Sequence, residues 1–136
     1  LGVVITKADL GRPAIPMNRT ALGAANLGAP IRFVGYGKSV ANDAGSLGTR
    51  RSAWLTVSAV STGLVGSQGG GKAFTCNGDS GGPGLVTLGG VPRIVGVNSH
   101  GNLTCSGTNW STRVDTFAAS FVDPYISKFD PAWKPL

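Results

Sequence analysis

The stretch 75-TCNGDSGGP-83 sets one serine hydroxyl, that of Ser80, among three glycines. A serine is unreactive at its own pKa, so as a nucleophile it needs a neighbouring base and donors for the oxyanion that forms. Glycine-rich turns leave backbone N–H groups open to a ligand and can supply those donors. Gly, Asp, Ser and Pro are also common turn residues for steric reasons, so the stretch alone fits a plain turn as well.

The core of this stretch, GDSGGP at 78–83, resembles the nucleophile motif of the chymotrypsin/trypsin-like serine proteases. Three further blocks resemble segments of the same family and follow in the family's order. They are RFVGYG at 32–37, IVGVNSHG at 94–101 with a cysteine at 105, and STRV at 111–114. Four ordered blocks favour the nucleophile over the plain turn.

The resemblance implies an all-β fold, the trypsin-like double Greek-key antiparallel barrel. The chain supplies the last strand of the first barrel (1–10), the inter-barrel crossing (11–30), the second barrel (31–115), and a C-terminal helix and tail (116–136). We expect barrel strands near 31–35, 53–60, 72–75, 84–88, 92–99 and 109–114, with surface loops over 41–49 and 66–71. The 22 glycines and 8 prolines and the short apolar runs fit many strands joined by tight turns.

The C-terminal helix is predicted from residue 124 to residue 129, because Pro124 follows Asp123 as a first helical residue follows its N-cap. Phe117, Phe121 and Tyr125 recur at four-residue spacing, which predicts ordinary core packing. At the other end of the chain, the apolar residues 1–5 predict a buried strand.

The resemblance assigns a role to each residue of the nucleophile turn. Ser80 is the catalytic nucleophile, and the backbone N–H groups of Gly78 and Ser80 form the oxyanion hole. Asp79 supports the oxyanion turn through a buried ion pair with the amino terminus that zymogen cleavage frees. The alternative for Asp79 is a solvated turn carboxylate.

Substrate-binding residues follow from the same comparison. Phe74 lies at the base of the specificity pocket, Thr75, Asn77 and Gly101 line its walls, and residues 99–101 pair with the substrate as an added strand. Ser99 corresponds to the serine that hydrogen-bonds the orienting aspartate. A trypsin-like enzyme has Asp at the pocket base, so Phe74 predicts an apolar or small residue before the scissile bond.

The resemblance also implies a disulfide between Cys76 and Cys105, which joins the two walls of the pocket. Two cysteines do not by themselves establish pairing, and two free thiols are the alternative. The disulfide implies an oxidising compartment, so we expect a secreted or periplasmic protein.

The base and the acid that orient such a serine precede it in this family. The only histidine, His100, follows Ser80 by twenty residues and is expected to line the cleft. Residues 1–5 resemble the strand after the family's aspartate, so the chain starts just after that residue; Asp9 fits a solvated turn. We expect an N-terminal protease chain to supply both groups. The alternative is an inactive serine-protease homologue that binds without cutting.

The expected partners are this N-terminal chain and a polypeptide substrate, with a protein inhibitor as a further candidate. The net charge is +6, but the basic residues are scattered, which argues against nucleic-acid binding. No apolar stretch approaches the roughly 18 residues that span a bilayer, so no membrane partner is expected. Zinc and calcium motifs are absent from the sequence, and we expect no cofactor or metal.

Overall fold

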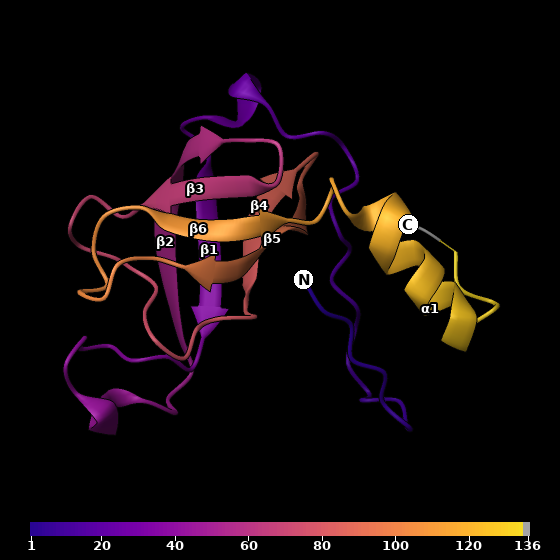
Figure 1. Ribbon diagram of the computed structural model, residues 1–136, viewed down its shortest axis with the longest axis horizontal. Helices are drawn as coiled ribbons and strands as arrows, with labels where there is room; N and C mark the ends of the chain where they lie inside the picture. Colours follow the sequence, from indigo (N-terminus) through magenta and orange to yellow (C-terminus); the bar gives the residue numbers. More distant parts are fainter. Residues whose placement is uncertain (135–136) are drawn as a thin grey trace.

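The structure, a computed structural model, describes residues 1–134, and its centre is a closed antiparallel barrel of six strands (Figure 1). The strands pair in the order β1-β2-β3-β6-β5-β4, and β4 returns to β1. Their bounds are β1 (Pro30–Gly35), β2 (Arg51–Val60), β3 (Leu64–Gln68), β4 (Pro83–Leu88), β5 (Val91–His100) and β6 (Asn109–Arg113). The all-β antiparallel fold is confirmed, and the chain forms one barrel of the two that the resemblance implies.

Alternation of apolar and polar side chains places one face of β1 in the core. In β1, Ile31 and Phe33 are buried while Arg32 between them is exposed, as a strand with one face in a core requires. The core holds eight buried residues, Leu22, Ile31, Phe33, Leu55, Val57, Val65, Val86 and Val95. Because closure pairs every strand on both sides, the barrel has no open edge.

One predicted strand is in the wrong place. Residues 72–75 form no strand. The strand that the prediction lacked is β3, whose last three residues fall in the predicted loop 66–71. A Cβ on Gly66 would lie 2.9 Å from Cζ3 of Trp110 on the neighbouring strand β6. Glycine at this position therefore lets an aromatic ring lie against the strand, and does not mark a loop.

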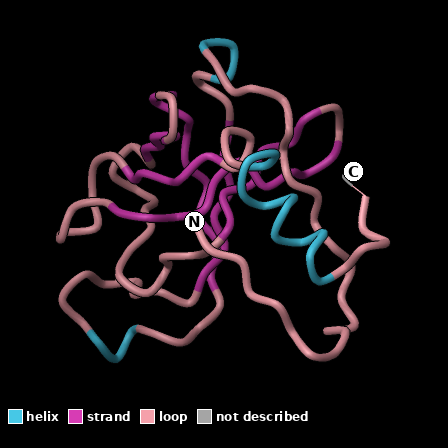
Figure 2. The backbone as a smooth tube through the Cα atoms, turned by 45° about the vertical axis from the view of Figure 1, so that its right-hand side comes forward, coloured by secondary structure: helices cyan, strands magenta, loops and turns pink. Residues whose placement is uncertain are grey.

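The strand predicted over residues 1–5 is absent from the structure. Residues 1–16 run outside the barrel without helix or strand (Figure 2), and the side chain of Val4 is 87 % exposed. A strand needs a neighbouring edge to pair with, and the closed barrel offers none. The chain first joins the barrel at β5, where the Ile94 N–H donates to the Pro16 carbonyl over 2.9 Å and the Ile94 carbonyl accepts from the Asn18 N–H over 2.8 Å.

Beyond β6 the chain enters a π-helical turn, η3 (Ala118–Val122), and continues directly into α1 (Asp123–Phe129). The helix and the early position of Pro124 are confirmed, but Asp123 is not its cap. Because η3 already provides the preceding turn, Asp123 has helical dihedral angles. Its carboxylate instead forms an ion pair of two hydrogen bonds with Arg19, over 2.7 and 2.9 Å. The last two residues of the predicted tail, 135–136, lie outside the described residues.

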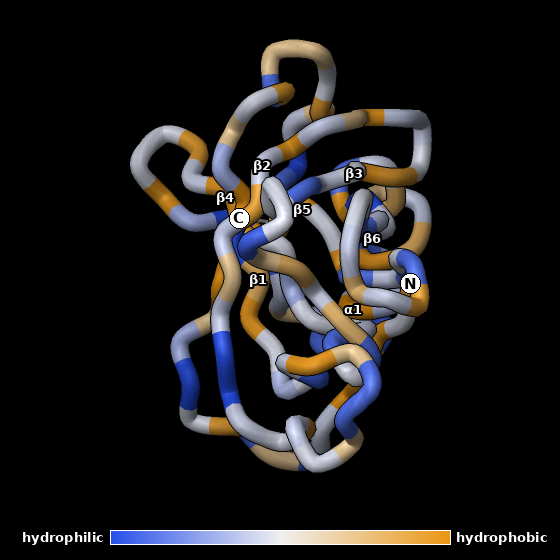
Figure 3. The backbone as a smooth tube through the Cα atoms, turned by 90° about the vertical axis from the view of Figure 1, so that its left-hand side faces the viewer, coloured by the Kyte–Doolittle hydropathy of each residue, from blue (hydrophilic) through white to orange (hydrophobic). Residues whose placement is uncertain are grey.

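The predicted core packing of the aromatic residues is wrong for Phe121 and Tyr125. Their side chains are exposed, as is that of Phe129, and the three rings contact one another along one side of η3 and α1. Hydrophobic residues also lie in segments outside the strands (Figure 3). Within residues 1–134, no helix has the length and apolar character needed to cross a membrane.

A buried ion pair fixes the segment around Leu22 to the end of β6. Arg113 donates to the Asp115 carboxylate and to the Ser61 and Leu22 carbonyls, while the Leu22 N–H donates to Asp115 over 3.0 Å. Burial raises the pKa of Asp115, but the hydrogen bonds from Arg113 and Leu22 outweigh it and leave that pKa below its ordinary value. The ion pair therefore needs an ionised Asp115.

Candidate active site

Residues 76–82, called the nucleophile turn here, connect a loop to the start of β4. Some backbone N–H groups of this turn have an acceptor and others have none. The N–H groups of Asp79, Gly81 and Gly82 donate to the carbonyls of Cys76, Asn98 and Asp79, over 3.0, 2.8 and 3.0 Å. Within residues 1–134, the N–H groups of Gly78 and Ser80 have no acceptor. Gly78 has a φ of +96°, a conformation that favours glycine. The turn thus keeps two amide donors free on either side of Asp79.

The Ser80 hydroxyl is exposed and makes one long hydrogen bond, to the Ser99 carbonyl over 3.3 Å. The imidazole of His100 lies against a different group, with Nδ1 3.3 Å from Ser99 Oγ. Since His100 is the only histidine of the chain, no imidazole here hydrogen-bonds Ser80. The structure therefore brings together the serine hydroxyl and the two free amides, and no histidine of the described residues contacts that hydroxyl.

The Asp79 carboxylate lies half-buried and is held by backbone amides. Its Oδ1 accepts from the Gly37 N–H over 2.8 Å and its Oδ2 from the Cys76 N–H over 2.9 Å. It makes no ion pair within the described residues, and the amino-terminal partner, which the resemblance places outside this chain, stays a prediction. A Cβ on Gly35 would lie 2.0 Å from Asp79 Oδ1, which shows that glycine is needed beside it.

The loop between β1 and β2 packs against the turn that contains Gly78 and Asp79. A Cβ on Gly78 would lie 2.8 Å from Leu47 Cδ2 and 3.1 Å from the Gly37 Cα. Leu47 follows the short helical turn η2 (Ala44–Ser46) in that loop. Because Gly37 also donates to Asp79, one loop contacts two residues of the turn.

The predicted disulfide between Cys76 and Cys105 is confirmed, with the two Cα atoms 5.0 Å apart. It ties the nucleophile turn to the loop that joins β5 and β6. Both cysteines are buried. The loop carrying residues 101–108 is therefore fixed to the turn that carries Ser80.

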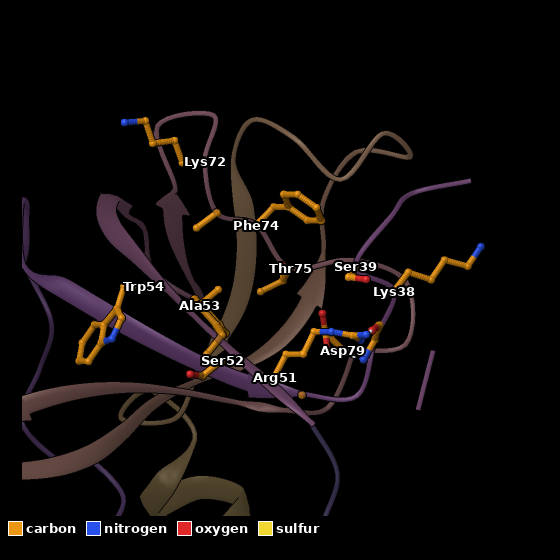
Figure 4. A pocket seen from close by; sticks show the side chains of 14 residues that line it. Lys38, Ser39, Arg51, Ser52, Ala53, Trp54, Lys72, Phe74, Thr75 and Asp79 are labelled. Atoms are coloured by element: carbon orange, nitrogen blue, oxygen red, sulfur yellow. Dashed lines mark hydrogen bonds between the residues drawn. The ribbon is translucent and has the colours of Figure 1, made fainter. Parts of the chain in front are cut away.

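The predicted substrate-binding residues line neighbouring cavities. Thr75, Asn77, Ser99, His100 and Gly101 line a cavity of about 170 Å³ together with Ser80. Phe74 lines a small cavity of about 10 Å³ together with Thr75 and Gly101. Phe74 and Thr75 also line a cavity of about 440 Å³, bounded by β2 residues and by Asp79 (Figure 4).

Sequence reasoning missed four residues that line the cavity of Ser80 and His100, of which Asn102 and Leu103 are exposed. Asn98 and Asn109 line it, and both are buried. The Thr75 hydroxyl donates to Asn109 Oδ1 over 2.6 Å. A polar residue at an inward position of a strand, where an apolar residue is usual, was the signal that could have identified both. Asn98 lies just before Ser99 in β5, and Asn109 begins β6.

Comparison with curated proteins finds no match. The model of the trypsin family matches residues 5–121, which include the whole barrel and the nucleophile turn. This chain therefore belongs to the trypsin family.

Proposed function

We propose that this chain is the nucleophile-bearing part of a serine endopeptidase, and that an N-terminal chain supplies the base and its orienting acid. The observation that carries the proposal is the pair of free amides, those of Gly78 and Ser80, beside an exposed serine hydroxyl. Such donors stabilise a developing oxyanion, and removing one of them costs about 3–4 kcal/mol in comparable enzymes.

In this mechanism Ser80 Oγ attacks the scissile carbonyl, and its proton passes to an imidazole from outside the chain. The carbonyl oxygen becomes an oxyanion that accepts from the N–H groups of Gly78 and Ser80. The imidazolium then gives its proton to the leaving amine, which leaves an ester on Ser80 that water hydrolyses. Residues 99–101, at the end of β5 and just beyond it, would pair with the substrate backbone.

Exposed apolar surface supports a partner chain. A second cavity that Ser80 lines, of about 410 Å³ and separate from the one with His100, has apolar side chains in its lining that include Ile15, Tyr36, Pro83 and Leu85. The side chains of Ile15 and Tyr36 are about half exposed, at 48 % and 55 %. A polypeptide that covers this surface would also stand next to Ser80, where the base is required. The disulfide favours a secreted or periplasmic location for the assembly.

The second candidate function is that of an inactive homologue that binds peptides without cutting them. The contact of His100 with Ser99 favours it, because the only imidazole of the chain is committed elsewhere. In this case the substrate-binding residues keep their role, and Ser80 contributes only a hydrogen bond.

Two measurements on the purified protein separate the candidates. Intact mass with N-terminal sequencing identifies the polypeptides present, and a fluorophosphonate then labels an activated serine. We expect a co-purifying chain that contains a histidine, and a label that Ser80→Ala abolishes. Ser58→Ala, an exposed position on β2, is the matched control and keeps the label. A single 13.7 kDa species without label would overturn the protease proposal in favour of the binding homologue.

A further inference from the structure

We propose that Arg51 is a positioning residue for the nucleophile turn, and that it acts through the loop between β1 and β2, residues 36–50. Its guanidinium holds this loop closed, and the loop in turn fixes the direction of the Gly78 N–H. The proposal rests on the proposed function, since that N–H is one of the two donors proposed to bind the oxyanion. It adds a residue outside the turn to those on which the reaction depends.

Arg51 begins β2, and its guanidinium binds backbone carbonyls of the loop that precedes it. Its Nη1 donates to the Ser46 carbonyl over 2.8 Å, and to the Gly37 and Thr49 carbonyls over 3.4 Å each. Gly37 lies near the start of the loop, and the other two residues lie near its end. One charged group therefore joins both ends of the loop, and a hydrogen bond from a charged donor is stronger than one between neutral groups.

The guanidinium of Arg51 has no carboxylate partner within residues 1–134. Arg51 and Asp79 line the same cavity of about 440 Å³ (Figure 4), but no ion pair joins them. The side-chain hydrogen bonds of Arg51 all go to the backbone of the loop. Its role is therefore to hold the loop, and not to neutralise an acid.

The loop reaches the nucleophile turn through a backbone hydrogen bond, in which the Lys38 N–H donates to the Asn77 carbonyl over 2.9 Å. The Asn77 carbonyl and the Gly78 N–H belong to one planar trans peptide, so they point in opposite directions. A donor that holds the carbonyl therefore also fixes the direction of the N–H. Without that donor, rotation of the peptide plane would turn the Gly78 N–H away from the oxyanion, and a glycine opposes such a rotation little.

Two further contacts join the loop to the same part of the turn. The Gly37 N–H donates to Asp79 Oδ1 over 2.8 Å, and a Cβ on Gly78 would lie 2.8 Å from Leu47 Cδ2. Leu47 directly follows Ser46, whose carbonyl accepts the shortest of the hydrogen bonds from Arg51. With the bond to the Asn77 carbonyl, the loop contacts three consecutive residues of the turn, and opening the loop would release all three contacts.

Amide hydrogen exchange, measured by NMR, tests the proposal without requiring catalysis. Arg51→Met removes the donors and keeps an unbranched apolar side chain. In this variant we expect the Gly37 and Lys38 N–H groups to lose their protection and to exchange at least about tenfold faster. The Val57 N–H of β2, which donates to the Ala29 carbonyl over 2.9 Å, should exchange at an unchanged rate, because the barrel stays folded.

The second readout is the rate at which a fluorophosphonate labels Ser80. It should fall about tenfold in Arg51→Met, because a loop that is open for most of the time no longer fixes the Gly78 N–H. Arg32→Met is the matched control, since Arg32 is exposed on β1 and donates across to Ser52 Oγ of β2 over 3.3 Å. This control should keep both the exchange rates and the labelling rate.

Arg51→Lys replaces Arg51→Met if the latter does not fold, as judged by circular dichroism. An ammonium lacks the planar fork of a guanidinium, so this variant should show the same two changes at smaller size.

Unchanged exchange of the Gly37 and Lys38 N–H groups in the folded variant would overturn the proposal, and so would labelling at the unsubstituted rate. An acceleration of the same size at Val57 would also overturn it, because Arg51 would then support the whole barrel. An unsubstituted protein that takes no label refutes the proposed function, while the exchange rates still decide the role of Arg51. Equal labelling of the unsubstituted and Arg51→Met proteins refutes the role of Arg51 alone.

Discussion

Removing the disulfide should destabilise the fold by an amount that follows from the loop it closes. Cys76 and Cys105 are 29 residues apart in sequence, and a cross-link over such a loop lowers the entropy of the unfolded chain. The chain-entropy relation for this loop gives about 3.6 kcal/mol at 25 °C. We therefore expect the double variant Cys76→Ser, Cys105→Ser to lose about 3.6 kcal/mol of unfolding free energy.

The assay is urea unfolding followed by the fluorescence of the three tryptophans. With a urea dependence of about 2 kcal/mol per molar, the midpoint should fall by roughly 2 M. Reduction of the unsubstituted protein should produce the same shift, which separates the loss of the bridge from any effect of the serine side chains. A loss below about 1 kcal/mol in both experiments would refute the loop-closure reasoning.

Three further predictions concern stability and the turn. Asp115→Asn should cost about 3–5 kcal/mol, because it leaves buried Arg113 unpaired. The folded pKa of Asp115 lies below its unfolded value, so its stabilisation is complete above the unfolded pKa and is lost as the pH falls through the folded pKa. The free energy of unfolding, measured against pH, should show this loss in the unsubstituted protein and not in Asp115→Asn. Gly35→Ala should cost about 1–3 kcal/mol and remove fluorophosphonate labelling, because its Cβ would displace Asp79. Arg19→Ala should cost about 1 kcal/mol or less in thermal unfolding and less still in 1 M salt, because the ion pair is partly exposed.

Each of these predictions has an outcome that contradicts it. The same loss of unfolding free energy at low pH in Asp115→Asn would mean that another carboxylate governs acid unfolding. Retained labelling in Gly35→Ala would mean that the position of Asp79 does not control the turn. A salt-independent loss in Arg19→Ala would assign the effect to packing, for example of the guanidinium over the Trp133 ring, which lies 5.5 Å away.

The motifs predicted the fold well where the residues of a segment themselves determine its structure. The predicted strands 31–35, 84–88, 92–99 and 109–114 match β1, β4, β5 and β6 to within one residue at each end, and the cysteine spacing in the family predicted the bridge that the structure contains. Gly66 misled the prediction, because its role depends on Trp110, a residue more than forty positions away in sequence. Residues 1–5 form no strand in this structure, and their place in the first barrel stays a prediction, because their apolar character says nothing about whether a free strand edge exists.

The site was predictable only in part, for a related reason. The free amides of the turn follow from local glycines, whereas the cavity lining depends on which way each neighbouring strand faces. Phe74 lines a small cavity together with Thr75, Gly101 and Asn109, while Asn98 and Asn109 line the cavity beside Ser80 from β5 and β6. Such placements come from the register of the barrel, which no single segment contains.

The crowding around Asp79 has a consequence for how this part of the chain tolerates mutation. Gly35, Gly37 and Gly82 each approach a neighbouring atom to 3.0 Å or less when a Cβ is added, so the fold itself forbids side chains there. Ser80, in contrast, is exposed and makes one long hydrogen bond, so folding places little demand on it. A library selected for folding alone would therefore preserve the glycines and randomise the serine. Only selection for chemistry retains both.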